Sequence, residues 1–293
     1  GGARLWDPAT GLLALTLFPG APSPGFASIV FSPDGRRVAA GGVDGVVLVG
    51  DAYSGNTELT LPAHTDMIWG LAFSPDGRRL VTTSWDKTTR VWDLATGEEL
   101  AAYTDHMDMV FGVVWSTDGQ RVYVGSDRYT RELDAATGQE LRRFYGDGLD
   151  VYGVDLSPDG KLLAQGRADG SVALWNVATG EKVRQLTGHG GLVLRVAFSQ
   201  DGQRLATASF DKYAKLWDAA TGEEMATFYG NTGNVFGAAL SPDGQRLATV
   251  GGDGALRLYT LDLAELVELA QARVSRSLTE EECQRYLHVA ACP

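Results

Sequence analysis

The turn motif Ser-Xaa-Asp-Gly occurs six times in this chain at an almost constant spacing. Successive motif aspartates are separated by 42, 42, 41, 42 and 42 residues. A period of this length indicates a repeat architecture, in which each repeat builds one supersecondary unit and neighbouring units share a core. The six aspartates are Asp34, Asp76, Asp118, Asp159, Asp201 and Asp243.

Each period divides into four short segments bounded by turn residues. In the second full repeat these are residues 68–74, 79–84, 88–92 and 99–104, which are rich in Val, Leu, Thr and aromatic residues. Such segments favour β-strands. Four antiparallel strands in each period of 41 or 42 residues predict one propeller blade per repeat.

A second motif lies 16 residues after the turn aspartate in the best repeats. Its good copies are Val91-Trp92-Asp93, Leu174-Trp175-Asn176 and Leu216-Trp217-Asp218, and another copy, Leu5-Trp6-Asp7, stands near the start. The period, the turn motif and the Trp-Asp pair together resemble the WD-repeat family over residues 1–260. This resemblance implies an all-β fold, the β-propeller.

The number of blades is less clearly specified than the fold. Six full repeats follow a leading fragment, residues 1–18, which supplies only a third and a fourth strand at residues 4–7 and 12–18. Propellers of the family usually close with seven blades. We therefore expect a seven-bladed propeller with an incomplete first blade, and the alternative is six complete blades with the fragment capping an edge.

The resemblance also implies a hydrogen-bonded set of four side chains in each intact blade. It consists of a histidine before the first strand, a Ser or Thr at the end of the second, an aspartate in the next turn and the tryptophan of the third. Such a set gives each buried polar group a partner. Two repeats match in full, with His64, Ser84, Asp86 and Trp92 in one and His189, Ser209, Asp211 and Trp217 in the other.

Other repeats depart from this pattern. Leu133 stands in a tryptophan position, and Asn231 stands in a histidine position. In the repeat between them, Asp147 and Arg167 replace the histidine and the serine. At roughly 1 kcal/mol net per hydrogen bond, these losses weaken blades without preventing them from forming.

Composition and charge exclude several classes of partner. The net charge of −12 opposes binding to nucleic acid or to an anionic membrane. No apolar run is long enough to span a bilayer, and the first residues lack the pattern of a signal peptide. We expect a cytoplasmic protein and, because the chain starts without methionine, a processed chain or a fragment. Cys283 and Cys292 lie too close to one end to staple the main body.

The sequence offers no catalytic motif, so we expect no enzyme, no cofactor and no metal site. Propeller enzymes place ligands or carboxylates around the central channel. The positions predicted to approach that channel are mostly glycines, which offer neither a ligand nor a base. They are Gly70, Gly112, Gly153 and Gly237, with Ser28 and Arg195 in the other two repeats.

Aromatic residues recur where each innermost strand begins. A β-branched residue such as Ile68 or Val110 points to the core there, and strand alternation turns its two neighbours toward the upper rim of the propeller. In the WD-repeat family, partners are commonly contacted by the residues at these two positions. The residue just before the aspartate of the four-residue set also commonly contacts partners. The resulting upper-rim candidates are Met67, Trp69, Trp85, Met109, Phe111, Tyr152, Phe210 and Phe236.

Asp66, Asp108 and Asp150 surround this set, so the complementary partner is a protein or peptide with basic residues around an apolar anchor. The competing interpretation is that some of these rings pack between adjacent loops. Contiguous apolar patches on soluble proteins usually mark interfaces. We favour an interface on this ground.

After Thr260 the pattern changes to helix, and residues 261–293 are predicted to form a helical tail packed on the propeller. A first helix is expected over residues 261–274 with Asp262 as its cap, and a second over residues 279–287. A linker is the other interpretation. Residues 277–288 resemble the ends of WD-repeat regions in bacterial multidomain signalling proteins, such as nucleotide-switch ATPases and protein kinases.

These observations predict a non-catalytic module that recognises a protein or peptide, which can be another domain of its own polypeptide. The resemblance of the tail implies the C-terminal sensor or autoinhibitory domain of a bacterial signalling protein. An intramolecular scaffold is the alternative, and a propeller enzyme is the rival from another class. Nucleic acid and membrane are not expected as partners.

Overall fold

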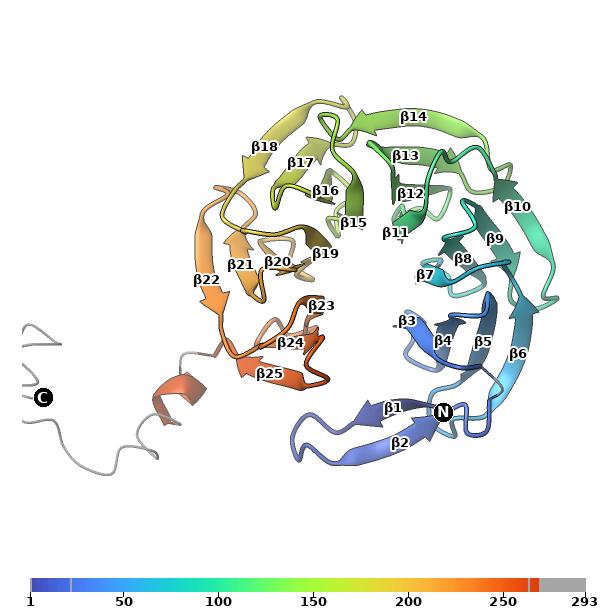
Figure 1. Cartoon of the computed structure of the whole chain (residues 1–293), viewed down its shortest axis with the longest axis horizontal. Helices are drawn as coiled ribbons and strands as arrows, with labels where there is room; N and C mark the ends of the chain where they lie inside the picture. The colour runs from blue at the N-terminus through green and yellow to red at the C-terminus, as the bar shows by residue number, and fades with distance from the viewer. Residues whose placement is uncertain (1, 22, 263, 269–293) are drawn as a thin grey trace, which may run out of the picture.

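The computed structural model describes residues 2–21, 23–262 and 264–268. In these residues every sheet is antiparallel and most strands pair with their neighbours in sequence. Figure 1 shows the sheets arranged around a common centre, with one strand of each repeat lining that centre. The predicted β-propeller is confirmed.

Six sheets form blades, and we number them in chain order. Five blades have four strands and blade 6 has three within the described residues. Blade 1 contains β3 (Phe26–Phe31), β4 (Arg37–Gly42), β5 (Val46–Asp51) and β6 (Thr57–Pro62). Blade 2 contains β7 (Ile68–Phe73), β8 (Arg79–Ser84), β9 (Thr89–Asp93) and β10 (Glu99–Tyr103), and blade 3 contains β11 (Val110–Trp115), β12 (Arg121–Ser126), β13 (Tyr129–Asp134) and β14 (Glu140–Tyr145).

The remaining three blades repeat this order. Blade 4 contains β15 (Val151–Leu156), β16 (Leu162–Arg167), β17 (Val172–Asn176) and β18 (Lys182–Leu186). Blade 5 contains β19 (Val193–Phe198), β20 (Arg204–Ser209), β21 (Ala214–Asp218) and β22 (Glu224–Phe228). Blade 6 contains β23 (Val235–Leu240), β24 (Arg246–Gly251) and β25 (Leu256–Thr260).

The expectation of seven blades is wrong. Residues before blade 1 form a separate two-stranded sheet, β1 (Ala3–Trp6) with β2 (Leu13–Leu17), which lies between blade 6 and blade 1 in Figure 1. This fragment supplies only two strands, so it cannot form a four-stranded blade. The buried side chains of Leu17 and Phe18 pack it against Val38 and Leu48 of blade 1. The fragment therefore sits at an edge of a six-bladed structure.

The Ser-Xaa-Asp-Gly motif closes the turn between the first and second strands of each blade. In blade 1 the Ser32 hydroxyl donates to Asp34 Oδ1 at 2.6 Å, and the same oxygen accepts the Arg36 amide at 3.0 Å. Gly35 has a φ of 69°, a left-handed conformation that glycine adopts without strain. The aspartate is thus used by its own turn, as turn chemistry predicts.

Neighbouring innermost strands approach each other closely at glycines. A Cβ atom on Gly112 would lie 2.8 Å from the Tyr152 carbonyl oxygen of the next blade, and one on Gly153 would lie 2.9 Å from the Leu194 carbonyl oxygen. At Gly112 and Gly153 the prediction of a channel-facing position is therefore wrong, because a side chain there would meet the next innermost strand, which passes directly beside them.

Beyond β25 the described chain forms one short helix over residues 264–268. Asp262 caps it, because Asp262 Oδ1 accepts the Ala264 amide at 2.8 Å. A helix capped by Asp262 is therefore confirmed, but it is described from residue 264 and not from the predicted start at residue 261. The predicted continuation to residue 274, the second helix and both cysteines lie outside the described residues.

Candidate functional site

The loops of the upper rim are anchored by buried polar side chains in blades 2 and 5. His64 Nδ1 lies 2.9 Å from Asp86 Oδ2, and His64 Nε2 lies 2.6 Å from Thr82 Oγ1. The Trp92 indole donates to the same Thr82 hydroxyl at 3.0 Å. Blade 5 repeats these three contacts. His189 Nδ1 lies 2.7 Å from Asp211 Oδ2, His189 Nε2 lies 2.7 Å from Thr207 Oγ1, and the Trp217 indole donates to Thr207 Oγ1 at 2.9 Å.

The assignment of the serine in these sets is therefore corrected. Ser84 donates to the Asp66 carbonyl at 3.0 Å, and Ser209 donates to the Gly191 carbonyl at 2.8 Å. Both serines lie at the end of the second strand, too near the rim loop to contact the tryptophan. The threonine two residues earlier on the same strand face joins histidine to tryptophan instead.

In blades 3, 4 and 6 charged side chains take part in the equivalent sets. In blade 4 the fully buried Arg167 donates to Asp147 Oδ2 at 2.8 Å, so the two substituted positions contact each other. In blade 6 Arg257 donates to Asn231 Oδ1 at 2.9 Å. In blade 3 burial, together with the charge of Arg131, lowers the pKa of His106 to about 3, so this histidine is neutral.

The side chains of the upper rim follow the predicted alternation. Ile68, Val110 and Val151 are fully buried, whereas the rings next to them in sequence, Trp69 and Phe111 among them, are partly exposed. Leu194 departs from the pattern because it is buried, at 2% exposure. Alternation is thus confirmed in most repeats, while partner binding by these residues stays a prediction.

The rim aromatics form two clusters. In the first, Trp85 stacks on Trp69 at a centroid distance of 5.6 Å, Trp69 meets Phe111 edge-on at 6.0 Å, and Phe111 lies 4.6 Å from Tyr152. This cluster crosses blades 2, 3 and 4. The second joins Phe210 of blade 5 to Phe236 of blade 6 at 5.8 Å. The rings therefore pack against one another and still form a partly exposed apolar surface.

The first cluster lies in an acidic setting. Asp66, Asp108 and Asp150 are exposed. Burial and the charges of Asp150 and Asp108 raise the pKa of the Tyr152 hydroxyl. A cationic group near Tyr152 would therefore be favoured by the local field.

The methionines extend the apolar surface into the loops. Met67 is partly exposed and Met109 is 38% exposed. Met107, which is 78% exposed, was not among the predicted rim residues. The alternating pattern of residues 106–111 places it on the same side as Met109 and would have identified it. Lys87 was also missed, and its ammonium donates to the Met107 carbonyl at 3.0 Å, which ties the loops of blades 2 and 3 together.

Two charged side chains lie near the centre of the ring. Arg195 of β19 donates to the Trp69 carbonyl of β7 at 3.3 Å and so links blade 5 to blade 2. Asp155 of β15 accepts the Phe198 amide of blade 5 at 2.7 Å. Burial raises the pKa of Asp155 to about 6. These contacts tie blades together and leave Asp155 as a carboxyl group that titrates near neutrality.

Asp155 gives a testable pH dependence. Because the folded-state pKa lies above the unfolded value, its contribution to stability is full below about pH 4 and is lost as the pH rises through 6. Asp155→Asn keeps an acceptor for the Phe198 amide and removes the charge. We expect this variant to be more stable than wild type by about 1–3 kcal/mol at pH 8 and equal to it near pH 4. Urea unfolding at both pH values measures the difference, and an equal gain at both would contradict the assignment.

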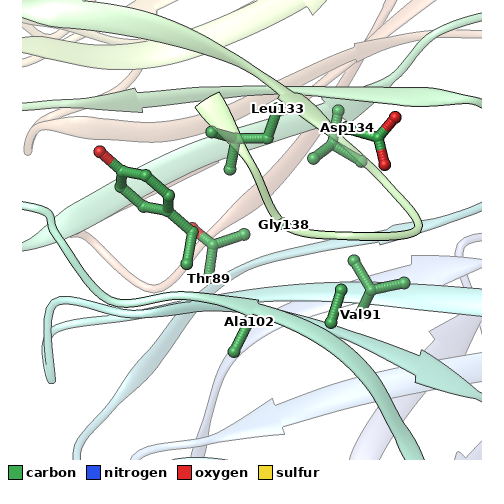
Figure 2. A pocket seen from close by; sticks show the side chains of 9 residues that line it. Thr89, Val91, Ala102, Leu133, Asp134 and Gly138 are labelled. Atoms are coloured by element: carbon green, nitrogen blue, oxygen red, sulfur yellow. The ribbon is translucent and has the colours of Figure 1, made fainter. Parts of the chain in front are cut away.

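A small cavity between blades 2 and 3 follows from Leu133 in the tryptophan position. Figure 2 shows Leu133 and Gly138 on one side and Thr89, Val91 and Ala102 on the other. Its volume of about 10 Å³ holds at most one water molecule. We assign it to the smaller leucine side chain and not to a ligand.

Within the described residues, no group of three or more His, Cys, Asp or Glu side chains is arranged to hold a metal ion. None of the described helices is long and apolar enough to cross a membrane.

Comparison with known proteins agrees with the fold. The family described as the IFT122 first beta-propeller matches residues 25–273, which is more than half of the chain. A search of curated proteins found no match. The matched region includes all six blades and excludes the separate sheet of β1 and β2. The chain therefore belongs to the family of the IFT122 first beta-propeller.

Proposed function

We propose that this propeller is a non-catalytic recognition module that binds a protein or peptide segment at its upper rim. The observation that carries the proposal is the aromatic cluster of Trp85, Trp69, Phe111 and Tyr152, which spans three blades and stays partly exposed. Large aromatic side chains at the centre of a patch are typical of binding hot spots. A propeller fold is also consistent with a protein-interaction module.

The chemistry of the rim supports a partner that combines a basic group with an apolar anchor. The exposed Asp66, Asp108 and Asp150 favour the basic group, and the rings provide the apolar contact. In addition, the indole nitrogens of Trp69 and Trp85 are buried and have no hydrogen-bond partner among the described residues. Unsatisfied donors of this kind are uncommon, and a bound segment could supply an acceptor after a small rotation of the rings.

Binding is tested by selecting ligands from a displayed peptide library with the whole chain and measuring affinities by fluorescence polarisation. We expect enriched peptides to carry Lys or Arg beside an aromatic or aliphatic residue, and their affinity to fall as salt is raised. Trp69→Ala and Phe111→Ala should each weaken binding at least about 30-fold, which corresponds to about 2 kcal/mol.

Tyr53→Ala is the matched control, because Tyr53 is 76% exposed and lies in the turn between β5 and β6, at the opposite end of the strands from the rim. Thermal unfolding of each variant separates a loss of binding from a loss of fold. Unchanged affinity in both rim variants would show that binding occurs elsewhere.

A narrower hypothesis is that this module is the cytoplasmic C-terminal sensor or autoinhibitory domain of a bacterial signalling protein. Its support is the resemblance of residues 277–288, which lie outside the described residues. An intramolecular scaffold remains the alternative, and it predicts that the library selection enriches no peptide. The rim proposal does not depend on this choice.

A further inference from the structure

Blades 3 and 4, which are neighbours in the ring (Figure 1), enclose a hollow at the end of the strands opposite the rim. Its volume of about 440 Å³ is in the range of ligand pockets. Three cationic side chains line it, those of Arg121, Arg142 and Lys161, and none of the described residues in its wall is acidic. We call it the basic hollow, and it is unexpected in a chain with a net charge of −12.

The charge of the basic hollow comes from four repeat positions. They hold Arg121 and Arg142 in blade 3 and Lys161 and Asn176 in blade 4. The equivalent positions hold Arg79, Ala101, Gln120 and Asp134 between blades 2 and 3, and Leu162, Arg184, Gln203 and Asp218 between blades 4 and 5. Each of those two sets has no net charge, whereas the set between blades 3 and 4 carries three positive charges.

Asn176 accounts for the missing acid. The residue that ends β5, β9 and β13 is an aspartate, and its carboxylate accepts the amides two and three residues later, as Asp93 does from Ala95 and Thr96. Asn176 accepts the Thr179 amide at 3.0 Å without carrying a charge. The turn is therefore kept while the basic hollow loses a carboxylate.

A buried carboxylate determines the course of Arg121. In blade 2 the equivalent Arg79 donates to the Gly119 carbonyl and so covers the turn of the next blade. Arg121 instead pairs with Glu132 Oε1 at 2.8 Å, and among the described residues no side chain donates to the Gly160 carbonyl. The basic hollow occupies the space that an arginine following the course of Arg79 would fill.

Two of the three cations keep donors for a ligand. Arg142 is held in place, because it pairs with Glu132 at 2.8 Å and donates to the Val177 and Ala178 carbonyls. Arg121 donates to Glu132 through one nitrogen, and its side chain is 46% exposed, so other N–H groups of its guanidinium remain available.

Lys161 is the second available donor. Its ammonium lies 3.1 Å from Asp159 Oδ2, but the two side chains are 78% and 54% exposed. Such an exposed pair contributes little, so the ammonium can turn toward a ligand at small cost. Arg121 and Lys161 therefore present donors to the basic hollow from opposite blades.

The charge identifies the class of ligand. Glu132, whose side chain is 3% exposed, neutralises one of the three cations, and two positive charges remain. A phosphate monoester carries about −1.5 to −2 at neutral pH, and guanidinium and ammonium groups are its usual donors. A nucleic acid or an anionic bilayer would also meet the acidic surface around the hollow, whereas a single phosphate group meets only the local charge.

We propose that the basic hollow binds a phosphorylated side chain of a peptide or protein segment, with Arg121 and Lys161 as donors to the phosphate oxygens. The site lies at the opposite end of the strands from the rim and does not depend on binding there.

The test uses the isotope-labelled whole chain and a capped peptide of five residues with phosphoserine at its centre. Amide signals of Gly160 and Ala178, which line the basic hollow, are followed by NMR during the titration. We expect saturable shifts with the phosphopeptide and none with the same peptide carrying serine. Absence of a saturable shift with the phosphopeptide would overturn the proposal.

Two variants and a matched control locate the site. Lys161→Glu should weaken phosphopeptide binding at least about tenfold, because it replaces a donor by a like charge. Asn176→Asp should also weaken it, although this change restores the turn residue of the other blades and so preserves the fold. Arg36→Glu is the control, because Arg36 is exposed at the same repeat position in blade 1 and the change in charge is identical. Equal weakening by Arg36→Glu and Lys161→Glu would overturn the assignment.

Other sources of phosphate are distinguished in the same titration. If inorganic phosphate binds as tightly as the phosphopeptide, the site takes a free phosphate and the peptide assignment is wrong. If vesicles containing phosphatidylserine bind the chain and Lys161→Glu abolishes this binding, the basic hollow is a membrane contact and the proposal is also wrong.

Discussion

Replacing Thr207 by valine is expected to lower the free energy of unfolding by about 2–4 kcal/mol. The Thr207 hydroxyl accepts from the Trp217 indole at 2.9 Å and lies 2.7 Å from His189 Nε2. Valine has the same shape but no hydroxyl, so both buried partners lose a hydrogen bond at once. Each group left unsatisfied costs about 1–3 kcal/mol. Urea unfolding measures the loss.

Thr249→Val in blade 6 is the matched control. Thr249 occupies the equivalent position on β24, and its buried hydroxyl has no hydrogen-bond partner among the described residues. Tyr259 replaces the tryptophan and donates to the Tyr229 carbonyl instead, so it does not need this hydroxyl. We expect Thr249→Val to be neutral or slightly stabilising. Equal losses of unfolding free energy in both variants would show that the hydrogen bonds of Thr207 do not stabilise the fold.

Asp147→Asn is expected to cost about 2 kcal/mol, because it leaves the buried Arg167 without a counter-charge. The Arg167 side chain is 1% exposed and that of Asp147 is 45% exposed, which places the expected loss below that of a fully buried pair. Asparagine tolerates the positive φ of 55° at this position, so the backbone is not disturbed.

A double-mutant cycle with Arg167→Met tests the pairing. Methionine removes the buried charge, so Asp147→Asn should cost much less in the Arg167→Met background. The pH dependence has a defined sign. Hydrogen bonds from Lys182 and Arg167 lower the pKa of Asp147, so its contribution is present at neutral pH and is lost as the pH falls below about 4. Additive costs, or a penalty that persists at pH 3, would contradict an ion pair.

The propeller itself could be predicted from the sequence because its signals are local. The turn at Asp76 predicts the bend between β7 and β8, and the run that ends in Trp92 predicts β9 to within a residue. The serine in the four-residue set was misassigned because Ser84 and Thr82 lie on the same face of β8. Which of the two hydroxyl groups the Trp92 indole reaches depends on how far the indole lies from the rim loop. The sequence of a single repeat does not show that distance.

The arrangement of the rim was predictable only in part. Alternation predicted that Trp69 and Phe111 flank buried residues, but their grouping depends on the angle between blades 2 and 3. Leu194 interrupts the series because it is buried, and the guanidinium of the next residue, Arg195, reaches the Trp69 carbonyl. Contacts between residues 126 positions apart leave no signal in one sequence.

The glycine contacts of the innermost strands also determine where this ring can deform. From blade 2 to blade 5, Gly70, Gly112 and Gly153 hold successive strands at backbone contact, so these blades resist sliding past one another. A Cβ on Gly237 of blade 6 would meet only Val250 of its own blade. The ring is therefore tightly packed from blade 2 to blade 5 and more easily deformed where blade 6 faces blade 1. We expect a force on the fragment β1–β2 to separate blade 6 from blade 1 before it moves the aromatic cluster of blades 2, 3 and 4.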